Sequence, residues 1–346
     1  MAQLLDSQEF LSSTSDRDLI DVRSPSEFLI GHIPGAYNLP LLSDEERKIV
    51  GTLYKQNSHQ EAILKGLEFV GVKLNVFVKE VLTFCKNKKL AIYCWRGGQR
   101  SQSMAWLFKQ AGFDVVILKN GYKAYRHWIL DHFDYTQFQF VIIAGKTGSA
   151  KTVILKHLGL QNEQVIDLEK LAQHKGSAFG GIGEKPQPSF EQFGNNLFQV
   201  LNQYDISKRI WIENESKAIG LVRIPDGMWN SLIKSNLIEL IVDKQLRIQH
   251  LVEVYSKFPK IELVNGFNKI GKRLGNLHLS QAIAAVENND FTKAAEIGLL
   301  YYDKRYQHSL NLMVDKYYTS YEIDYFDFEK IAIELIACAN KLEYER

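Results

Sequence analysis

The stretch LAIYCWRGGQRS, residues 90–101, constrains the fold more than any other part of the chain. Its first four residues, Leu90 to Tyr93, are apolar and predict a buried strand. Apolar residues at helical spacing follow from Ser101, so a helix is expected to begin there. The intervening loop holds a cysteine, two arginines and two glycines. It predicts a cradle for an anion beside a thiolate.

The residue types of this loop suggest its chemistry. A free thiol has a pKa near ~8.5, which a helix N-terminus and nearby guanidinium groups lower, so Cys94 is a candidate nucleophile. Arg96 and Arg100 would neutralise a phosphate-like group. Gly97 and Gly98 allow backbone N–H groups to turn inward and hold an anion. We therefore predict a catalytic loop in preference to a half-buried structural cysteine.

Length and composition limit the setting. A chain of 346 residues suggests about two domains of roughly 150 residues each. With 42 basic and 40 acidic residues, any nucleic-acid surface must be a local patch. The three cysteines lack the spacing of a metal site or disulfide framework, which favours a reducing, cytoplasmic setting. Neither a secretory leader nor an apolar run of about 18 residues is present, so we expect no membrane association.

A second glycine-containing loop lies in QFVIIAGKTGSAKT, residues 139–152. An apolar strand, this loop and a helix follow one another as in a P-loop, whose amides surround phosphates while its lysine and hydroxyl reach the outer oxygens and magnesium. Ala150 stands where the pattern expects glycine, and a left-handed backbone there costs about 1–2 kcal/mol. We expect phosphate binding, and the alanine leaves open whether the loop also binds and hydrolyses a nucleotide. The predicted phosphate-binding residues are Gly145, Lys146, Thr147, Gly148, Ser149, Lys151 and Thr152.

Three acidic residues follow predicted strands further along the chain. Asp167 ends the strand in VIDLEK, and Glu213 and Glu215 end the strand in RIWIENES. Such positions supply the magnesium-associated carboxylate of P-loop proteins. A carboxylate at a strand end also often caps the next helix, so both interpretations stay open.

The segment AQHKGSAFG, residues 172–180, is predicted to be a polar loop of the second domain. His174 is either a solvated side chain or an acid or base beside bound phosphate. Ser177, in the same loop, is a further candidate. Mg²⁺ is the expected cofactor, without an assigned set of protein ligands.

The stretch DVRSPSEFLIGHIPGAYNLP, residues 21–40, resembles the N-terminal signature of the rhodanese family. The loop of Cys94 lies where that family keeps its catalytic cysteine, and the resemblance covers roughly residues 4–128. It implies a parallel α/β domain with Cys94 at the carboxyl end of a strand. Five residues separate Cys94 from Arg100, one more than in many rhodaneses. This longer loop resembles that of cysteine-based phosphatases with the same fold and indicates a phosphate-sized ligand.

A wider, ordered set of motifs resembles the bacterial tRNA 2-selenouridine synthase family, in which a rhodanese domain is fused to a P-loop domain. The resemblance implies replacement of sulfur by selenium in a thiolated wobble uridine of the tRNA anticodon. It also implies selenophosphate as donor and S-geranylation with geranyl diphosphate. The matching stretches are GTLYKQ, YCWRGGQRS, GKTGSAKT, DLEKLAQHKGSAFG, QPSFEQF, WIENESKAIG, RIPDGMW and YYDKRYQH.

From these resemblances we expect an α/β fold with a rhodanese-like parallel-sheet domain over 1–132. A P-loop NTPase-like α/β domain with a largely helical C-terminal region should cover 133–346. Our hypothesis places geranyl diphosphate and magnesium in the P-loop. Selenophosphate would bind the Cys94 loop, where the thiolate forms a transient covalent bond. The alternatives are a rhodanese-type sulfurtransferase or cysteine-dependent phosphatase fused to a phosphate-binding domain, and a non-catalytic binding module.

The C-terminal region carries a basic run between residues 244 and 273. Such runs are usually solvated helix faces, and in a tRNA-modifying enzyme they are candidates for phosphate contacts. Tyrosines further on are expected either to stack an anticodon base or to pack in the core. The basic residues are Lys244, Arg247, Lys257, Lys260, Lys269, Lys272 and Arg273, and the tyrosines are Tyr301, Tyr302 and Tyr306.

Overall fold

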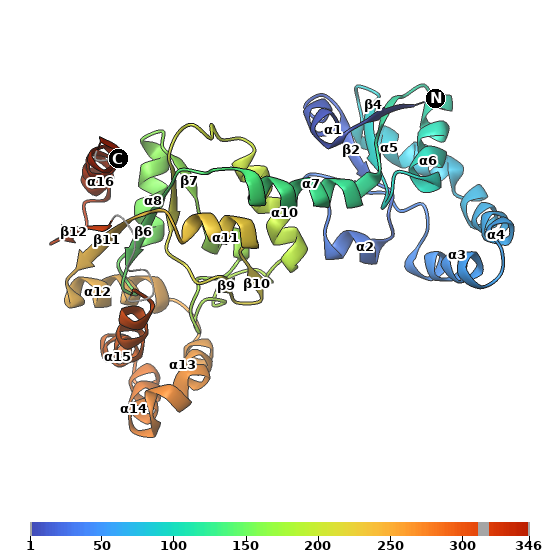
Figure 1. Cartoon of the computed structure of the whole chain (residues 1–346). Helices are drawn as coiled ribbons and strands as arrows, with labels where there is room; N and C mark the ends of the chain where they lie inside the picture. Colours follow the sequence, from blue (N-terminus) through green and yellow to red (C-terminus); the bar gives the residue numbers. More distant parts are fainter. Residues whose placement is uncertain (1, 311–317, 345–346) are drawn as a thin grey trace. The chain divides into compact units, whose positions relative to one another are not determined.

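The structure is a computed structural model that describes residues 2–310 and 318–344. The side chains of residues 307 and 308, which end the YYDKRYQH stretch, lie outside the described part. Each of two compact units has its own five-stranded sheet (Figure 1). The units are Met1–His132 with Gly194–Gln199, and Phe133–Phe193 with Val200–Arg346. Residues 194–199 were expected in the second domain.

The sheet of the N-terminal unit has the strand order β1-β5-β4-β2-β3, with every neighbouring pair parallel. Leu90 to Tyr93 of the central strand β4 are fully buried, as the apolar run predicted, because helices cover both faces of a parallel sheet. The predicted rhodanese-like, parallel α/β class is confirmed. The strands are β1 (Gln3–Leu5), β2 (Asp18–Asp21), β3 (Tyr37–Asn38), β4 (Lys89–Tyr93) and β5 (Asp114–Leu118).

Two of this unit's helices differ from the predicted bounds. α6 begins at Gln99, two residues before the expected start. α7 runs on to Tyr135, past the predicted domain boundary at residue 132, because buried Phe133 extends the apolar stripe of Ile129 by one turn. The helices are α1 (Ser7–Ser13), α2 (Pro25–Ile30), α3 (Asp44–Gln56), α4 (His59–Gly71), α5 (Leu74–Phe84), α6 (Gln99–Gln110) and α7 (Gly121–Tyr135).

The sheet of the C-terminal unit has the order β12-β11-β6-β8-β7 and is also parallel. Its edge strand β12 lies in the C-terminal region, which was expected to be largely helical. β12 pairs along its whole length with β11, which precedes it by more than 70 residues. The strands are β6 (Phe140–Gly145), β7 (Gln164–Ile166), β8 (Ile210–Glu213), β11 (Asn236–Val242) and β12 (Tyr318–Ile323), with a separate antiparallel pair, β9 (Ala218–Ile219) and β10 (Val222–Arg223).

The C-terminal region is largely helical, as predicted. In Figure 1, α13, α14 and α15 lie together away from the sheet, and they share an apolar cluster that includes Phe267, Val286 and Ile297. No helix in the described ranges is long and apolar enough to cross a bilayer. The helices are α8 (Lys151–Leu160), α9 (Leu168–Ala172), α10 (Phe190–Leu201), α11 (Asp226–Leu232), α12 (Lys244–Tyr255), α13 (Lys260–Leu274), α14 (Asn276–Glu287), α15 (Phe291–Leu310) and α16 (Phe328–Tyr344).

Candidate functional site

Cys94 follows β4 directly and is 3% exposed. Its sulfur lies 3.2 Å from Ser101 Oγ, and Ser101 donates to the Gly98 carbonyl at 3.1 Å. Ser101, in the first turn of α6, therefore holds the sulfur at the helix N-terminus, a role that sequence reasoning missed. Cys85 differs, because burial and a hydrogen bond that its thiol donates to Asp18 raise its pKa to about 11. Of the two buried thiols, only Cys94 lies in a loop suited to catalysis.

The glycines of the Cys94 loop have unequal roles. Gly97 has φ +64°, and a Cβ there would lie 2.8 Å from both Leu118 O and Asn120 N. Gly98 has an extended backbone and open space around it, so glycine is not required there. Gly121, which no prediction included, has φ +63°, and its Cβ would lie 2.3 Å from Cys94 O. Glycine is therefore needed on both sides of the contact between the loop and α7.

The two predicted arginines also differ. Arg96 is exposed. Arg100 is held by Glu27 of α2, with Nη1–Oε2 at 2.6 Å and Nη2–Oε1 at 3.2 Å. Burial alone would raise the pKa of Glu27, but hydrogen bonds from Arg100 and the Ser24 N–H bring it below its usual value. An anion bound by Arg100 must therefore share this guanidinium with Glu27.

A buried ion pair supports the elements that flank the Cys94 loop. Arg23, only 1% exposed, meets Asp21 with Nη2–Oδ2 at 2.6 Å and donates to the Gly31 carbonyl at 2.6 Å. Its guanidinium carbon lies 3.8 Å from the centre of the Tyr122 ring at the start of α7. These contacts join the end of β2 to α7. Asp21 and Arg23, which belong to the stretch that resembles the rhodanese signature, therefore have a structural role.

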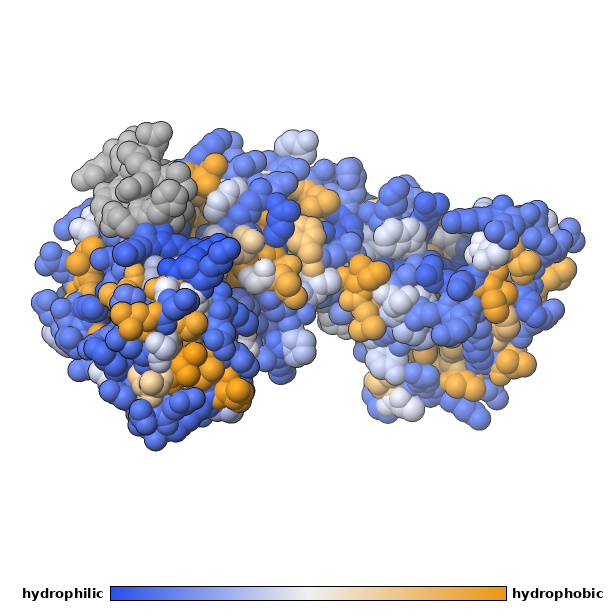
Figure 2. All heavy atoms as spheres, turned by 90° about the horizontal axis from the view of Figure 1, so that it is seen from below, coloured by the Kyte–Doolittle hydropathy of each residue, from blue (hydrophilic) through white to orange (hydrophobic). Residues whose placement is uncertain are grey.

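A cavity of about 540 Å³ adjoins Arg100 within the same unit. Side chains of α3, α4 and α6 line it, and most are apolar. Leu64 and Leu67 of α4 are more than half exposed, and the space-filling view shows orange patches on this unit (Figure 2). Helices α3 and α4 therefore form an apolar hollow together with α6.

The second loop joins β6 to α8 as predicted. Ala150 has φ +57° and ψ +28°, the left-handed conformation in which alanine costs about 1–2 kcal/mol. Lys151 Nζ donates to the Gly145 carbonyl at 3.0 Å and so lies over the loop. Ser149 donates to the Lys146 carbonyl. Residues 146–150 therefore form a turn between β6 and α8, and Lys151 and Thr152 begin the helix.

Arg247 holds the P-loop through a hydrogen bond to its backbone. It is 3% exposed, donates to the Thr147 carbonyl at 3.2 Å, and pairs with Asp303 of α15 at 2.8 and 2.9 Å. A Cβ at Gly148 would lie 2.8 Å from Arg247 O. The expectation that Arg247 belongs to a solvated basic face or contacts tRNA phosphate is wrong, because Asp303 supplies the charge that allows its burial.

Carboxylates gather behind the loop. Thr152 Oγ1 donates to Glu169 Oε2 at 3.1 Å and lies 3.5 Å from Glu213 Oε2. Burial, reinforced by neighbouring carboxylates, raises the pKa of Glu213 well above its usual value and that of Glu215 to about 7. Burial likewise raises the pKa of Glu169. Glu169 was absent from the predicted site, although it stands two residues after Asp167.

Asp167 itself is a helix cap. Its Oδ1 accepts from the Lys170 N–H at 2.7 Å at the start of α9. Among the described residues, no three His, Cys, Asp or Glu side chains converge to hold a metal. Thr152 and Glu169 offer oxygen donors of the kind Mg²⁺ accepts together with phosphate oxygens and water. The residues thus fit Mg²⁺ as a partner of bound phosphate.

The polar loop of His174 lies against the P-loop. Within the described part of the chain, His174 Nδ1 is buried without a hydrogen-bond partner. Burial, then the nearby Lys269 charge, lower the pKa of His174 and favour its neutral form. Gly176 has φ +62° and lies so close to Glu215 that a Cβ would sit 2.4 Å from Oε2. Ser177 Oγ accepts from the Phe179 N–H at 3.2 Å.

The P-loop and the loop of His174 line a cavity of about 650 Å³ in the C-terminal unit. Gly145, Lys146, Asp167 and Glu213 are not among the lining residues. The predicted residues that line the cavity are Thr147, Gly148, Ser149, Lys151, Thr152, His174, Ser177 and Glu215, joined by Glu169, Lys269, Arg273 and Tyr302.

The predicted tyrosines differ in their surroundings. Burial opposes ionisation of Tyr301, but hydrogen bonds from Arg273 and Arg305, both 3.2 Å long, lower its pKa. Tyr306 instead donates to Glu239 at 2.9 Å, consistent with packing.

Comparisons with known proteins identify the family of each part of the chain. The family profile described as tRNA 2-selenouridine synthase AAA domain matches residues 138–324, more than half of the chain, and the rhodanese-like domain profile matches residues 4–127. A Sulfurovum protein named tRNA 2-selenouridine synthase is 34% identical over 299 residues, which cover 80% of each chain. The chain belongs to the tRNA 2-selenouridine synthase family.

Other relatives with the same name show how far the similarity extends. The Nitrosomonas europaea protein is 37% identical over 248 residues, which cover 70% of this chain and 64% of that protein. The Shewanella frigidimarina protein is 31% identical over 353 aligned positions, with 91% and 95% coverage. On this chain, the rhodanese-like profile lies within the unit of Cys94, and the profile of the tRNA 2-selenouridine synthase AAA domain covers most of the unit of Lys151.

Proposed function

We propose that this chain is a tRNA-modifying enzyme that converts 2-thiouridine at the wobble position to 2-selenouridine. The observation that carries the proposal is the pair of anion cradles. One holds a buried thiol at a helix N-terminus, and the other is a P-loop backed by carboxylates. The relatives are named for a selenouridine product in tRNA, and two cradles can hold separately the two phosphate-bearing reagents of a two-step exchange of sulfur for selenium.

The first step uses geranyl diphosphate at the P-loop. The uridine sulfur attacks C1 of the geranyl group, so a C–S bond forms and the C–O bond to pyrophosphate breaks. Pyrophosphate leaves with the electron pair, and the uridine N3 proton is released. Lys151 and the loop N–H groups would stabilise this charge. Mg²⁺, bound by Thr152 together with the diphosphate, would supply further positive charge.

The second step uses selenophosphate at Cys94. Selenium in selenophosphate is already at the selenide level, so a sulfur–selenium bond would require an oxidant. Attack of the thiolate on phosphorus needs none: the S–P bond forms, the P–Se bond breaks, and hydroselenide leaves. Water then releases phosphate from the cysteine. A phosphate-sized loop with Arg100 at its edge suits this reaction.

Hydroselenide then attacks C2 of the S-geranylated uridine. The C–Se bond forms, the C–S bond breaks, and geranylthiolate leaves with the electron pair and takes a proton from solvent. The proton of hydroselenide passes to N3. The apolar cavity beside Arg100 offers room for the geranyl group in this step.

Nucleoside mass spectrometry tests the proposal. Thiolated tRNA is incubated with the protein, Mg²⁺, geranyl diphosphate and selenophosphate, and each component is omitted in turn. We expect S-geranyl-2-thiouridine without selenophosphate and 2-selenouridine with the complete mixture. Unchanged tRNA under every condition, with phosphate release from an aryl phosphate, would instead support the phosphatase alternative.

A further inference from the structure

An apolar pocket opens beside the P-loop cavity. The two share wall residues, among them Thr147 of the P-loop itself. From that shared wall the apolar pocket extends between α12, α13 and α15, away from the charged residues of the P-loop cavity. The shared residues are Thr147, Ser177, Leu251, Tyr255 and Tyr302.

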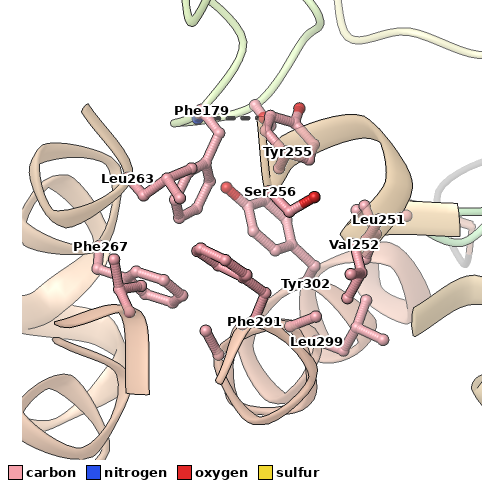
Figure 3. Close-up of a pocket in the computed structure, with 16 residues that line it drawn as sticks. Phe179, Leu251, Val252, Tyr255, Ser256, Leu263, Phe267, Phe291, Leu299 and Tyr302 are labelled. Carbon is pink, nitrogen blue, oxygen red and sulfur yellow. Dashed lines mark hydrogen bonds between the residues drawn. The ribbon is translucent and has the colours of Figure 1, made fainter. Parts of the chain in front are cut away.

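Aromatic and aliphatic side chains form the pocket. Figure 3 shows the rings of Phe179, Phe267, Phe291 and Tyr302 around one space. Leu299 lies on the side of the pocket away from Phe267. The rings of Phe179 and Phe267 meet edge to face, with centroids 5.0 Å apart. No charged side chain is among the residues that line it. A ligand group that enters this pocket must therefore be apolar.

The polar groups at the entrance already have partners. The Tyr302 hydroxyl accepts from the Ala178 N–H at 3.1 Å, and Ser177 Oγ accepts from the Phe179 N–H at 3.2 Å. Burial raises the pKa of both Tyr302 and Tyr255, so these phenols stay neutral. Uncharged side chains therefore form the boundary between the charged P-loop cavity and the apolar pocket.

We propose that this pocket, with a free volume of about 80 Å³, holds the first isoprene unit of the hydrocarbon chain of an allylic diphosphate whose phosphates bind the P-loop. The inference rests on the proposed function and adds the chain-binding subsite. A diphosphate on the P-loop amides and Lys151 brings its first carbon to the shared wall at Thr147. That part of the hydrocarbon chain then leaves water for an apolar space, so binding strengthens with each CH₂ group that is buried.

Gly298 of α15 keeps this pocket open. Glycine is buried here in a helix, and an added Cβ would lie 3.6 Å from the Phe267 ring, an ordinary contact. A leucine would extend beyond that point, beside the Phe267 ring, and take up part of the pocket that Gly298 lines. Gly298 therefore determines how much chain the pocket accepts.

The experiment measures dissociation constants for pyrophosphate, dimethylallyl diphosphate and geranyl diphosphate in the presence of Mg²⁺. For the wild type we expect affinity to rise with chain length, by roughly tenfold or more from pyrophosphate to geranyl diphosphate. Gly298→Leu should bind geranyl diphosphate no more tightly than pyrophosphate and keep the wild-type affinity for pyrophosphate. Thr292→Leu, at an exposed position of the same helix, should resemble the wild type.

Ala295→Leu provides a second way to fill the pocket if Gly298→Leu does not fold, since Ala295 lines it from the next turn of α15. Wild-type affinity for geranyl diphosphate in folded filling variants would overturn the inference. Equal affinity of the wild type for all three ligands would overturn it as well. Tighter binding of geranyl diphosphate without formation of S-geranyl-2-thiouridine would leave the pocket in place and remove the proposed function.

Discussion

Ala150 holds a left-handed backbone conformation in the P-loop. Alanine has a Cβ that disfavours this conformation, and glycine has none. We expect Ala150→Gly to raise the free energy of unfolding by about 1 kcal/mol, after the entropy cost of glycine is subtracted. Urea denaturation measures the change. In the matched control Ala284→Gly, at an exposed helical position of α14, stability should fall by about 0.5–1 kcal/mol. A loss of stability in both variants would contradict the account of strain.

Glu215 makes stability depend on pH. Burial and the nearby Glu169 carboxylate raise its pKa to about 7, so the folded state keeps a proton that the unfolded state loses near pH ~4.3. The stability from this proton is complete below the unfolded pKa and is lost as pH rises through about 7. The midpoint temperature of thermal unfolding should therefore decrease as the pH is raised from about 5 to about 8.

The Glu215→Gln variant tests this assignment, because glutamine does not titrate. Its unfolding midpoint should change less over the same pH range than that of the wild type. The exposed carboxylate of Asp114 provides a control, since Asp114→Asn should keep the wild-type slope. Equal slopes for the wild type and Glu215→Gln would assign the pH dependence to another group.

Contacts between elements hold the P-loop in shape. Arg247 of α12 contacts the loop carbonyl of Thr147 and Asp303 of α15. Asp303→Ala should destabilise the protein by about 2–3 kcal/mol, because it leaves a buried guanidinium without its partner, although Asp303 is partly exposed. Chemical denaturation measures this loss. Glu296→Ala, which breaks the exposed pair with Lys293 on the same helix, should cost at most about 0.5 kcal/mol.

A double variant distinguishes charge from packing at this contact. Arg247→Met with Asp303→Leu removes both charges and keeps most of the side-chain volume. We expect it to recover part of the stability lost in Asp303→Ala. If the double variant is less stable than the single one, the hydrogen bond from Arg247 to the P-loop matters more than the ion pair.

At the scale of the whole molecule, each unit repeats one arrangement. A parallel strand ends in a loop that leads into a helix N-terminus, with Cys94 in the first unit and Lys151 in the second. We expect Cys94→Ala to retain S-geranylation and lose selenation by at least about a hundredfold. Lys151→Ala should lose geranylation and still selenate tRNA that is already geranylated.

Mass spectrometry of tRNA nucleosides measures both reactions in the same sample. Cys85→Ala provides the control for removal of a buried thiol, since Cys85 lies outside both loops. It should keep both activities. Loss of both reactions in Cys94→Ala would contradict the assignment of one reaction to each unit.

The local sequence by itself determined the central strands of both sheets and the positions of the predicted site residues that follow them. Apolar runs ending in glycine-containing loops marked β4 and β6, because buried parallel strands need a continuous apolar stretch. The same runs placed Cys94, Lys151 and Thr152 at strand ends and helix starts. Ala150 was recognisable as the position of backbone strain from its place in the P-loop pattern alone.

Tertiary structure decided the features that depend on partners distant in the chain. Glu27 engages Arg100, Asp303 allows Arg247 to be buried, and Gly121 fits against the Cys94 loop. Each depends on a partner more than 20 residues away, which local patterns do not reveal. β12 was missed for the same reason, since its hydrogen bonds are to β11. The apolar pocket beside the P-loop likewise exists only because helix packing brings Phe179 against α13 and α15.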